Sequence, residues 1–135
     1  MAAGVRAHAR QTNLGVVDAR PLTTLERATL LRLTEPALFD GAAEYREQVD
    51  HAMVVGRCDC GCPTIDLAID RSVAPRSPRA GTLLLPVEGD LGEGDDHMQL
   101  ICFARDGWLQ TLELVYAAPP PPAAFPDPRA WQLIT

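Results

Sequence analysis

Apolar residues recur at helical spacing in the first part of this chain and alternate as in strands further on. Thr23 and Glu26 have the spacing of a capping box, and a broad apolar helix side follows as far as Pro36, whose ring disfavours helix before it. A second helix is predicted after Asp40, taken as its N-cap, up to Ala52. The pattern therefore predicts two helices ahead of the first strand.

Two alternating runs flank a turn rich in cysteine and glycine, and their apolar residues allow two registers. A three-residue loop at 59–61 sets Met53 opposite Leu67 and collects the large apolar side chains on one face of the hairpin. A two-residue turn at 60–61 instead pairs Val54 with Leu67 and leaves Met53 on the outer face. We therefore expect the first register.

A second hairpin is predicted around the Asp-Gly pair at 106–107, because both turn positions need a positive φ that this pair tolerates. Its register would set Cys102 opposite Thr111 and point Phe103 toward the core. Cys102 is expected to be a buried thiol, since free cysteine usually behaves as a small core residue. A further strand is predicted at 82–87 from its alternating leucines.

The remaining segments are predicted as a loop and two ends. The acidic run 88–97 lacks the ligand spacing of a calcium loop, so we expect a solvated, mobile loop without specific calcium binding. Residues 1–20 show no sustained apolar stripe and are expected to form a flexible tail. Residues 119–135 contain a proline run typical of polyproline II and would form an arm anchored by Phe125 and Trp131.

These elements together predict a single α+β domain at residues 21–118. Two N-terminal helices would pack on one face of an antiparallel sheet of about five strands, connected as meander-like hairpins. A chain of 135 residues is long enough to bury a core of that size without disulfides.

The cysteine turn also carries a resemblance to other proteins. Residues 56–67, GRCDCGCPTIDL, follow the two predicted helices, and this pattern with its G-x-C-x-C-G-C-P motif resembles short actinobacterial proteins of unassigned function. The resemblance covers residues 22–70. It implies no activity, so no catalytic residue is carried over from it.

The same turn is the strongest candidate for chemistry in the chain. Cys58 and Cys62 would face each other across the hairpin with Cys60 above them, so that three thiolates could converge on zinc. The fourth position would then fall to Cys102, His97 or solvent. One residue between cysteines is tighter than the usual spacing of structural zinc sites, which favours a plain structural turn. A zinc site on Cys58, Cys60, Cys62 and Cys102 and a reactive, disulfide-forming tip are the alternatives.

Composition narrows the classes of function. All 12 basic residues are arginine, so P-loop, Schiff-base and lysine-base chemistries are excluded. A net charge of −6 disfavours nucleic acid as a partner and favours a basic protein. No apolar stretch has the length of a secretory signal or a membrane span, so we expect a cytoplasmic protein with no membrane contact, in a reducing compartment.

No complete catalytic constellation accompanies the cysteines. Ser72 and Ser77 lie in a proline-rich segment, and neither His51 nor His97 has the partners that a cysteine nucleophile needs. Enzymatic activity is therefore disfavoured but left open. The sequence favours a non-catalytic interaction or inhibitor-type module. A zinc-binding module built on the cysteine hairpin is the alternative, and a thiol-dependent enzyme is the second alternative.

Overall fold

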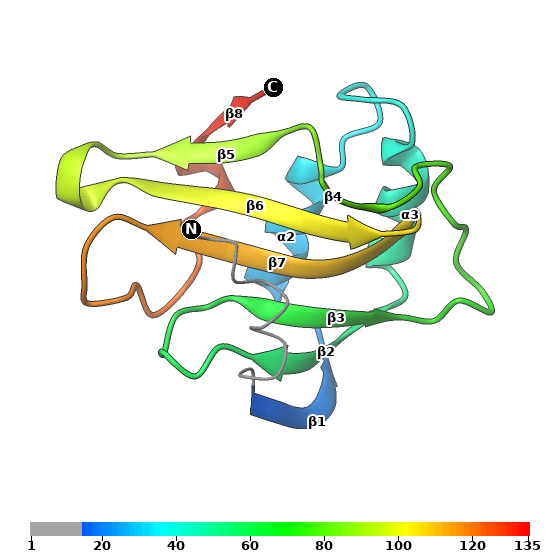
Figure 1. The fold of residues 1–135 in the computed structure, drawn as a ribbon, viewed down its shortest axis with the longest axis horizontal. Coiled ribbons are helices and arrows are strands. Elements are labelled where there is room, and N and C mark those ends of the chain that lie inside the picture. The colour runs from blue at the N-terminus through cyan, green and yellow to red at the C-terminus, as the bar shows by residue number, and fades with distance from the viewer. Residues whose placement is uncertain (1–14) are drawn as a thin grey trace.

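The computed structural model describes residues 15–135, and Figure 1 shows them as a twisted antiparallel sheet with two α-helices packed behind it. The α+β class expected from the sequence is confirmed. In chain order the helices and strands are β1 (Gly15–Pro21), α2 (Thr24–Leu33), α3 (Ala42–Val49), β2 (Ala52–Arg57), β3 (Ile65–Ile69), β4 (Thr82–Leu84), β5 (Glu88–Leu91), β6 (Met98–Arg105), β7 (Trp108–Tyr116) and β8 (Gln132–Ile134). Two single 3-10 turns, η1 (Gly94–Asp96) and η2 (Pro128–Ala130), precede β6 and β8.

Within the described residues the sheet has eight strands, so the prediction of about five was too low. The order across the sheet is β1-β2-β3-β7-β6-β5-β8, and β4 pairs with β6 outside this path. The predicted strand 82–87 is correct only as far as Leu84, and Pro86, which has no amide hydrogen for a ladder, follows it. A simple meander is also wrong, because β3 pairs with β7 and not with β4.

The three strands that the pattern missed lie in segments predicted as a tail, a loop and an arm. Residues 15–20, assigned above to the tail, belong to the sheet because β1 pairs with β2, whereas residues 1–14 lie outside the described part. The first residues of the acidic run form β5, which pairs with β6 and β8. β5 and β8 are short, and the sequence of β1 lacks alternation, so ladder hydrogen bonds to neighbours, and not a sequence period, define these strands.

The C-terminal arm lies on the molecule through buried aromatic side chains. Trp131 is 2% exposed and Phe125 is 4% exposed. The Arg32 guanidinium lies 4.4 Å from the Trp131 ring centre and donates to the carbonyls of Trp131 and Pro128. Gly89 on β5 leaves room for the ring, since a Cβ there would overlap Trp131. The anchoring of residues 119–135 by Phe125 and Trp131 is therefore visible in the structure.

The two helices begin differently. The capping box of α2 is confirmed, because the Glu26 amide donates to Thr23 Oγ1 at 3.0 Å and the Thr23 amide donates to Glu26 Oε1 at 2.9 Å. Asp40 is not the N-cap of α3, since that position belongs to Gly41, whose φ of 93° suits glycine. Within residues 15–135, neither helix is long and apolar enough to cross a membrane.

The core lies between the helices and the covered face of the sheet. Tyr45 of α3 is fully buried. The buried Gln48 side chain ties α3 to the second hairpin, donating to the Gly107 carbonyl at 2.8 Å and accepting from the Leu109 amide at 2.9 Å. The central members of this core are Leu30, Leu33, Tyr45, Val54, Ile65, Leu100 and Leu112.

Away from the turn, residues 52–54 of the β2–β3 hairpin pair as in the second predicted register, whereas next to the turn Arg57 pairs with Ile65, which fits neither register. Val54 pairs with Leu67 and is fully buried, whereas Met53 pairs with Ala68 and is 37% exposed. The register shifts between Val54 and Gly56, which is a β-bulge. Because three apolar residues follow one another here, alternation alone could not decide which of them faces the core.

The β6–β7 hairpin turns at 106–107 as predicted, but its register is displaced by one residue beyond the turn. Cys102 pairs with Leu112, not with Thr111, because a bulge at Gln110 of β7 shifts the register. The buried residues of β6 are consequently Leu100, Cys102 and Ala104, and the inward assignment of Phe103 is wrong. The predicted burial of Cys102 is confirmed at 1% exposed.

Candidate metal centre

The loop between β2 and β3, residues 58–64, is closed by hydrogen bonds from both sides. The Cys58 amide donates to the Thr64 carbonyl at 3.2 Å. Thr64 is itself buried, and its hydroxyl accepts from the Leu114 amide of β7 at 3.0 Å. Gly61 turns the chain with a φ of 93°, a conformation that other residues rarely adopt. The loop is therefore fastened to the middle of the sheet.

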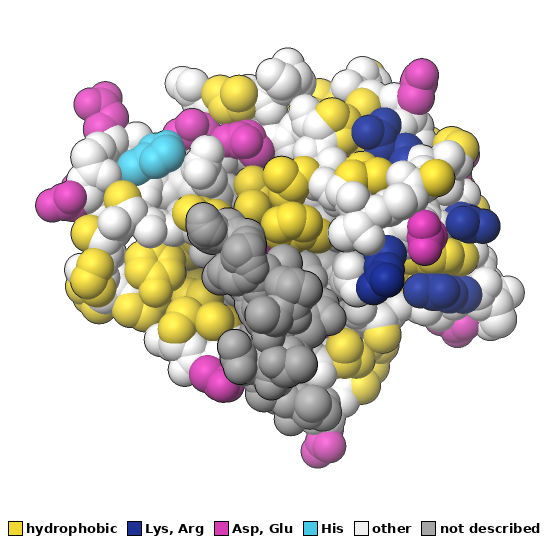
Figure 2. Space-filling view, in the orientation of Figure 1, with side chains coloured by type: hydrophobic (Ala, Val, Ile, Leu, Met, Phe, Trp, Pro, Cys, Tyr) yellow, Lys and Arg dark blue, Asp and Glu magenta, His cyan; other side chains and the backbone are white. Residues whose placement is uncertain are grey.

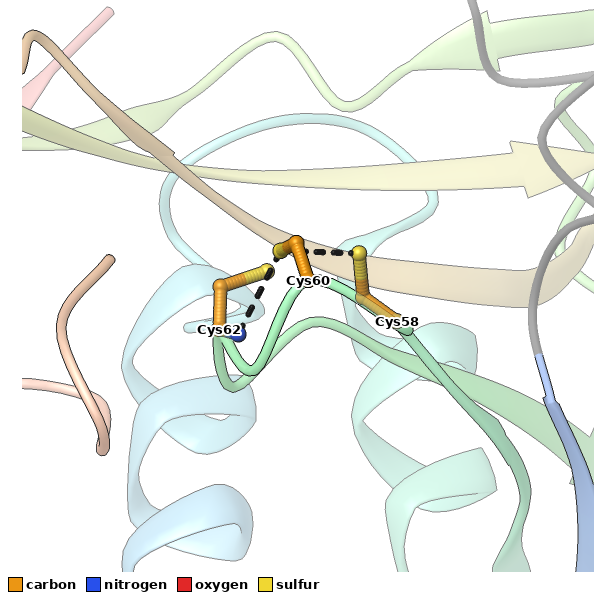
Figure 3. Close-up of side chains that lie close together, drawn as sticks. All are labelled: Cys58, Cys60 and Cys62. Carbon is orange, nitrogen blue, oxygen red and sulfur yellow. Dashed lines mark hydrogen bonds between the residues drawn. The ribbon is translucent and has the colours of Figure 1, made fainter. Parts of the chain in front are cut away.

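Three cysteine sulfurs converge above this loop, as Figure 3 shows. The Cys58 thiol donates to Cys60 Sγ at 3.1 Å, and the backbone amide of Cys62 donates to the same sulfur at 3.3 Å. All three Sγ atoms lie within 4.8 Å of one another. Cys60 is exposed, Cys58 is half-buried and Cys62 is buried.

Tyr116, at the end of β7, is a member of the site that sequence reasoning missed. Its hydroxyl donates to Cys60 Sγ at 4.0 Å. The same side chain lines an open hollow of about 510 Å³, together with His97 and the prolines that follow β7. In Figure 2 this end of the molecule, on the left, shows gathered hydrophobic side chains with acidic groups around them. Only the pairing of β3 with β7, which the sequence does not reveal, brings Tyr116 to the cysteines.

The surroundings shift the pKa values of Cys58 and Cys60 in opposite directions. Burial, followed by the hydrogen bond to Cys60, raises the pKa of Cys58 to about 12. Burial also opposes ionisation of Cys60, but hydrogen bonds from Cys58, Cys62 and Tyr116 outweigh it and lower the Cys60 pKa. Burial and the hydrogen bond to Cys60 raise the pKa of Tyr116. Of Cys58 and Cys60, Cys60 is therefore the thiol that ionises first.

Two residues considered as a fourth ligand lie elsewhere. Cys102 is buried on β6, and burial raises the pKa of its thiol to about 12. The His97 Nε2 atom is hydrogen-bonded to Asp90 Oδ1 at 2.8 Å. In the part of the chain that the structure describes, the group that could hold a metal consists of Cys58, Cys60 and Cys62 alone.

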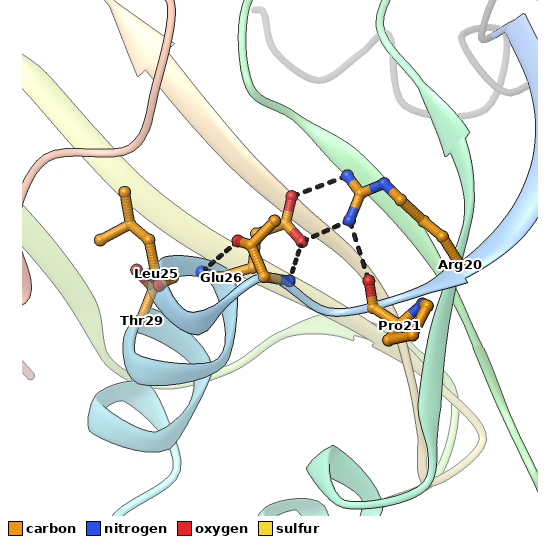
Figure 4. Close-up of polar contacts among 6 residues, drawn as sticks. Arg20, Pro21, Leu25, Glu26 and Thr29 are labelled. Atoms are coloured by element: carbon orange, nitrogen blue, oxygen red, sulfur yellow. Dashed lines mark hydrogen bonds and ion pairs between the residues drawn. The ribbon is translucent and has the colours of Figure 1, made fainter.

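A second polar cluster, shown in Figure 4, joins β1 to α2 and has a structural role. The Arg20 guanidinium donates to both carboxylate oxygens of Glu26, at 2.9 and 3.0 Å. Glu26 also closes the capping box with Thr23. Because these groups satisfy one another, the cluster offers no free ligand and fixes the strand against the helix.

The cysteine loop thus combines three convergent sulfurs, three hydrogen-bond donors to the sulfur of Cys60 and an exposed side. Thiolates are soft ligands, and three of them at one point can hold zinc or another soft metal ion. Comparison with known protein families, with curated proteins and with solved structures finds no match to this chain.

Proposed function

We propose that this protein binds one soft metal ion, zinc in the first place, through the thiolates of Cys58, Cys60 and Cys62. The observation that supports this most strongly is that their sulfurs lie within 4.8 Å of one another. Zinc holds each thiolate at about 2.3 Å with tetrahedral angles, which sets ligand sulfurs about 3.8 Å apart. Small rotations of the three side chains would produce that spacing without moving the backbone.

The hydrogen bonds around Cys60 support the same proposal. The Cys62 amide and the Tyr116 hydroxyl both point donors at the Cys60 sulfur. Donors of this kind orient a metal-bound thiolate and stabilise its charge, and they influence affinity strongly. The Thr64 contacts to β2 and β7 would hold the loop in place whether or not an ion is bound.

Three protein ligands leave one tetrahedral position for solvent or an outside ligand. Structural zinc sites are closed by four protein ligands, whereas sites with an exchangeable position use three. Cys60 is exposed, so an outside ligand can approach the ion from that side. We therefore propose an exchangeable metal site and not a metal that staples the fold.

Elemental analysis of protein purified without a chelating tag tests this proposal. We expect about one zinc per chain, and its loss when Cys58 and Cys62 are both changed to serine. Cys102→Ala is the matched control, because it removes a thiol outside the group and should keep the metal. The site would be excluded if wild-type protein reconstituted with zinc held no metal. It would also be excluded if the wild type, the double serine variant and Cys102→Ala held equal amounts of zinc.

The role as an interaction or inhibitor-type module for a basic protein stays a second candidate. Its support is that Glu93, Asp95 and Asp96 are exposed together around η1. A pull-down with the purified chain, repeated with Asp95→Asn and Asp96→Asn combined, tests it. If the wild-type chain and the double variant recover the same basic protein, that protein does not bind through this acidic segment.

A further inference from the structure

We infer that the cysteine loop has a second activity, thiol–disulfide exchange, in which Cys60 and Cys58 become an intramolecular disulfide while a small disulfide such as oxidised glutathione is reduced. This activity goes beyond metal binding and does not require it. The two functions use the same thiols. A bound metal ion therefore prevents the exchange, and the disulfide prevents metal binding.

The separation of the sulfurs suits bond formation between Cys58 and Cys60. Their Sγ atoms are 3.1 Å apart, and a disulfide bond is about 2.0 Å long, so roughly 1 Å of approach closes it. Side-chain rotation within an exposed loop supplies that movement. The third sulfur, on Cys62, stays within 4.8 Å but is buried.

Exposure assigns the order of the steps. Cys60 is exposed and meets a dissolved disulfide more readily than the half-buried Cys58, which lies next to the sulfur that Cys60 has captured. The amide of Cys62 and the hydroxyl of Tyr116 hold the Cys60 sulfur on the open side of the loop. Cys60 is therefore the attacking thiol and Cys58 the resolving thiol.

The exchange balances in two steps. The Cys60 thiolate attacks one sulfur of the small disulfide, a Cys60–glutathione bond forms, and the glutathione sulfur–sulfur bond breaks to release one thiolate. The Cys58 sulfur then attacks Cys60 Sγ, the Cys58–Cys60 bond forms, and the second glutathione leaves as thiolate. The two cysteine protons pass to the two departing thiolates. The protein is oxidised by two electrons and the small disulfide is reduced by two.

The product disulfide would be reversible. Cysteines two residues apart in an exposed loop close a small ring, and strained or exposed disulfides belong to the oxidising, labile class. Formation of this bond removes two of the three sulfurs proposed to hold the metal ion. Oxidation would therefore release the ion, and reduction would restore the site.

Mass spectrometry of the metal-free full chain incubated with oxidised glutathione tests the inference. The wild type should lose two hydrogens, keep no glutathione and carry a bond that peptide mapping assigns to Cys58–Cys60. Cys58→Ser should keep one glutathione on Cys60, because the resolving step is missing. Cys60→Ser should react at least about tenfold more slowly, and Cys102→Ala, which removes a buried thiol outside the loop, should behave as wild type.

Three results would contradict the roles assigned to Cys60 and Cys58. A stable glutathione adduct on the wild type, a bond mapped to Cys60–Cys62, or a Cys60→Ser variant that reacts as fast as wild type would overturn the assignment. Thermal melts show whether each variant is folded. If Cys58→Ser is not folded, Cys58→Ala takes its place in the experiment. Because metal is absent throughout, exchange can succeed while zinc binding fails, and zinc binding can succeed while exchange fails.

Discussion

Cys58, Cys60 and Cys62 are separated by single residues, yet their surroundings give them different chemistry. Cys58 is half-buried and its pKa is raised to about 12, whereas the Cys60 pKa is lowered by the donors that point at its sulfur. Cys62 contributes its backbone amide to that sulfur as well as a buried thiol. The site is therefore organised around Cys60, and the two other cysteines support it.

The contribution of Tyr116 can be isolated by removing one oxygen atom. Tyr116→Phe removes the hydroxyl that donates to Cys60 Sγ, so we expect a higher Cys60 pKa and a zinc affinity lower by about tenfold. Competition with a coloured chelator measures the affinity, and the pH dependence of alkylation measures the pKa. Tyr45→Phe is the control, since it removes a phenol oxygen from the core. Unchanged affinity and an unchanged alkylation profile in Tyr116→Phe would contradict the role assigned to this hydroxyl.

Part of the site could be predicted from the sequence and part could not. Three cysteines around a glycine turn must lie close together, so convergence of their sulfurs followed from local geometry. The location of Tyr116 depends on the pairing of β3 with β7, and the pairing of Cys102 depends on a bulge at Gln110 of β7. Neither long-range pairing nor a bulge leaves a clear signal in one sequence.

At the scale of elements, Glu26 links β1 to α2 and makes this junction sensitive to pH. Burial favours the neutral acid, but hydrogen bonds from Arg20 and the Thr23 amide outweigh it and lower the Glu26 pKa. A carboxyl with a lowered folded-state pKa stabilises the fold above its unfolded pKa of about 4.3, and this contribution is lost as pH falls through the lower value. Glu26→Gln should therefore cost about 2 kcal/mol at neutral pH and progressively less in acid.

Denaturant unfolding at neutral and acidic pH measures this difference. Arg27→Gln is the matched control, because the Arg27–Asp50 pair at 2.7 Å joins two side chains that are each about half exposed. Exposed pairs contribute about 0–1 kcal/mol, so this variant should change stability little at either pH. If the difference in free energy of unfolding between Glu26→Gln and wild type stays constant as the pH falls, the charge of Glu26 does not contribute to stability.

The junction between β5 and the C-terminal arm provides a second test at this scale. Gly89 lies against the Trp131 ring, and a Cβ at this position would overlap it. Gly89→Ala should therefore lower the free energy of unfolding by about 1–3 kcal/mol, the usual cost of overpacking. Gly61→Ala is a useful comparison, because the space around Gly61 is open and its cost comes from the positive φ alone. Equal stability of Gly89→Ala and wild type would mean that the arm does not dock as described.

The helices were easier to predict than the strands for a physical reason. A capping box is a contact between Thr23 and Glu26, so its signal lies within one short stretch of sequence. β8 is three residues long and is defined by its pairing with β5, far away along the chain. Strands as short as β5 and β8 cannot show a period, and the sequence of the longer β1 does not alternate. These three missed strands account for the difference between five and eight.

At the scale of the whole molecule, the hydrophobic core is separate from the cysteine loop. The core cluster is built on α2, α3 and the covered face of the sheet, and Cys62 is buried outside it. Backbone hydrogen bonds to Thr64 fasten the loop without any contribution from sulfur. The fold should consequently persist when the metal is removed.

Thermal unfolding with and without zinc tests this separation of core and loop. A ligand that binds only the folded state at a concentration 100 times its dissociation constant stabilises it by about 2.7 kcal/mol. For a chain of 135 residues that corresponds to a rise in Tm of about 10 °C. The metal-free chain should keep its far-ultraviolet circular dichroism, and the Cys58→Ser, Cys62→Ser variant should show no rise with zinc. Loss of secondary structure on chelation would instead make the ion a structural staple, because the fold would then depend on the cysteine loop.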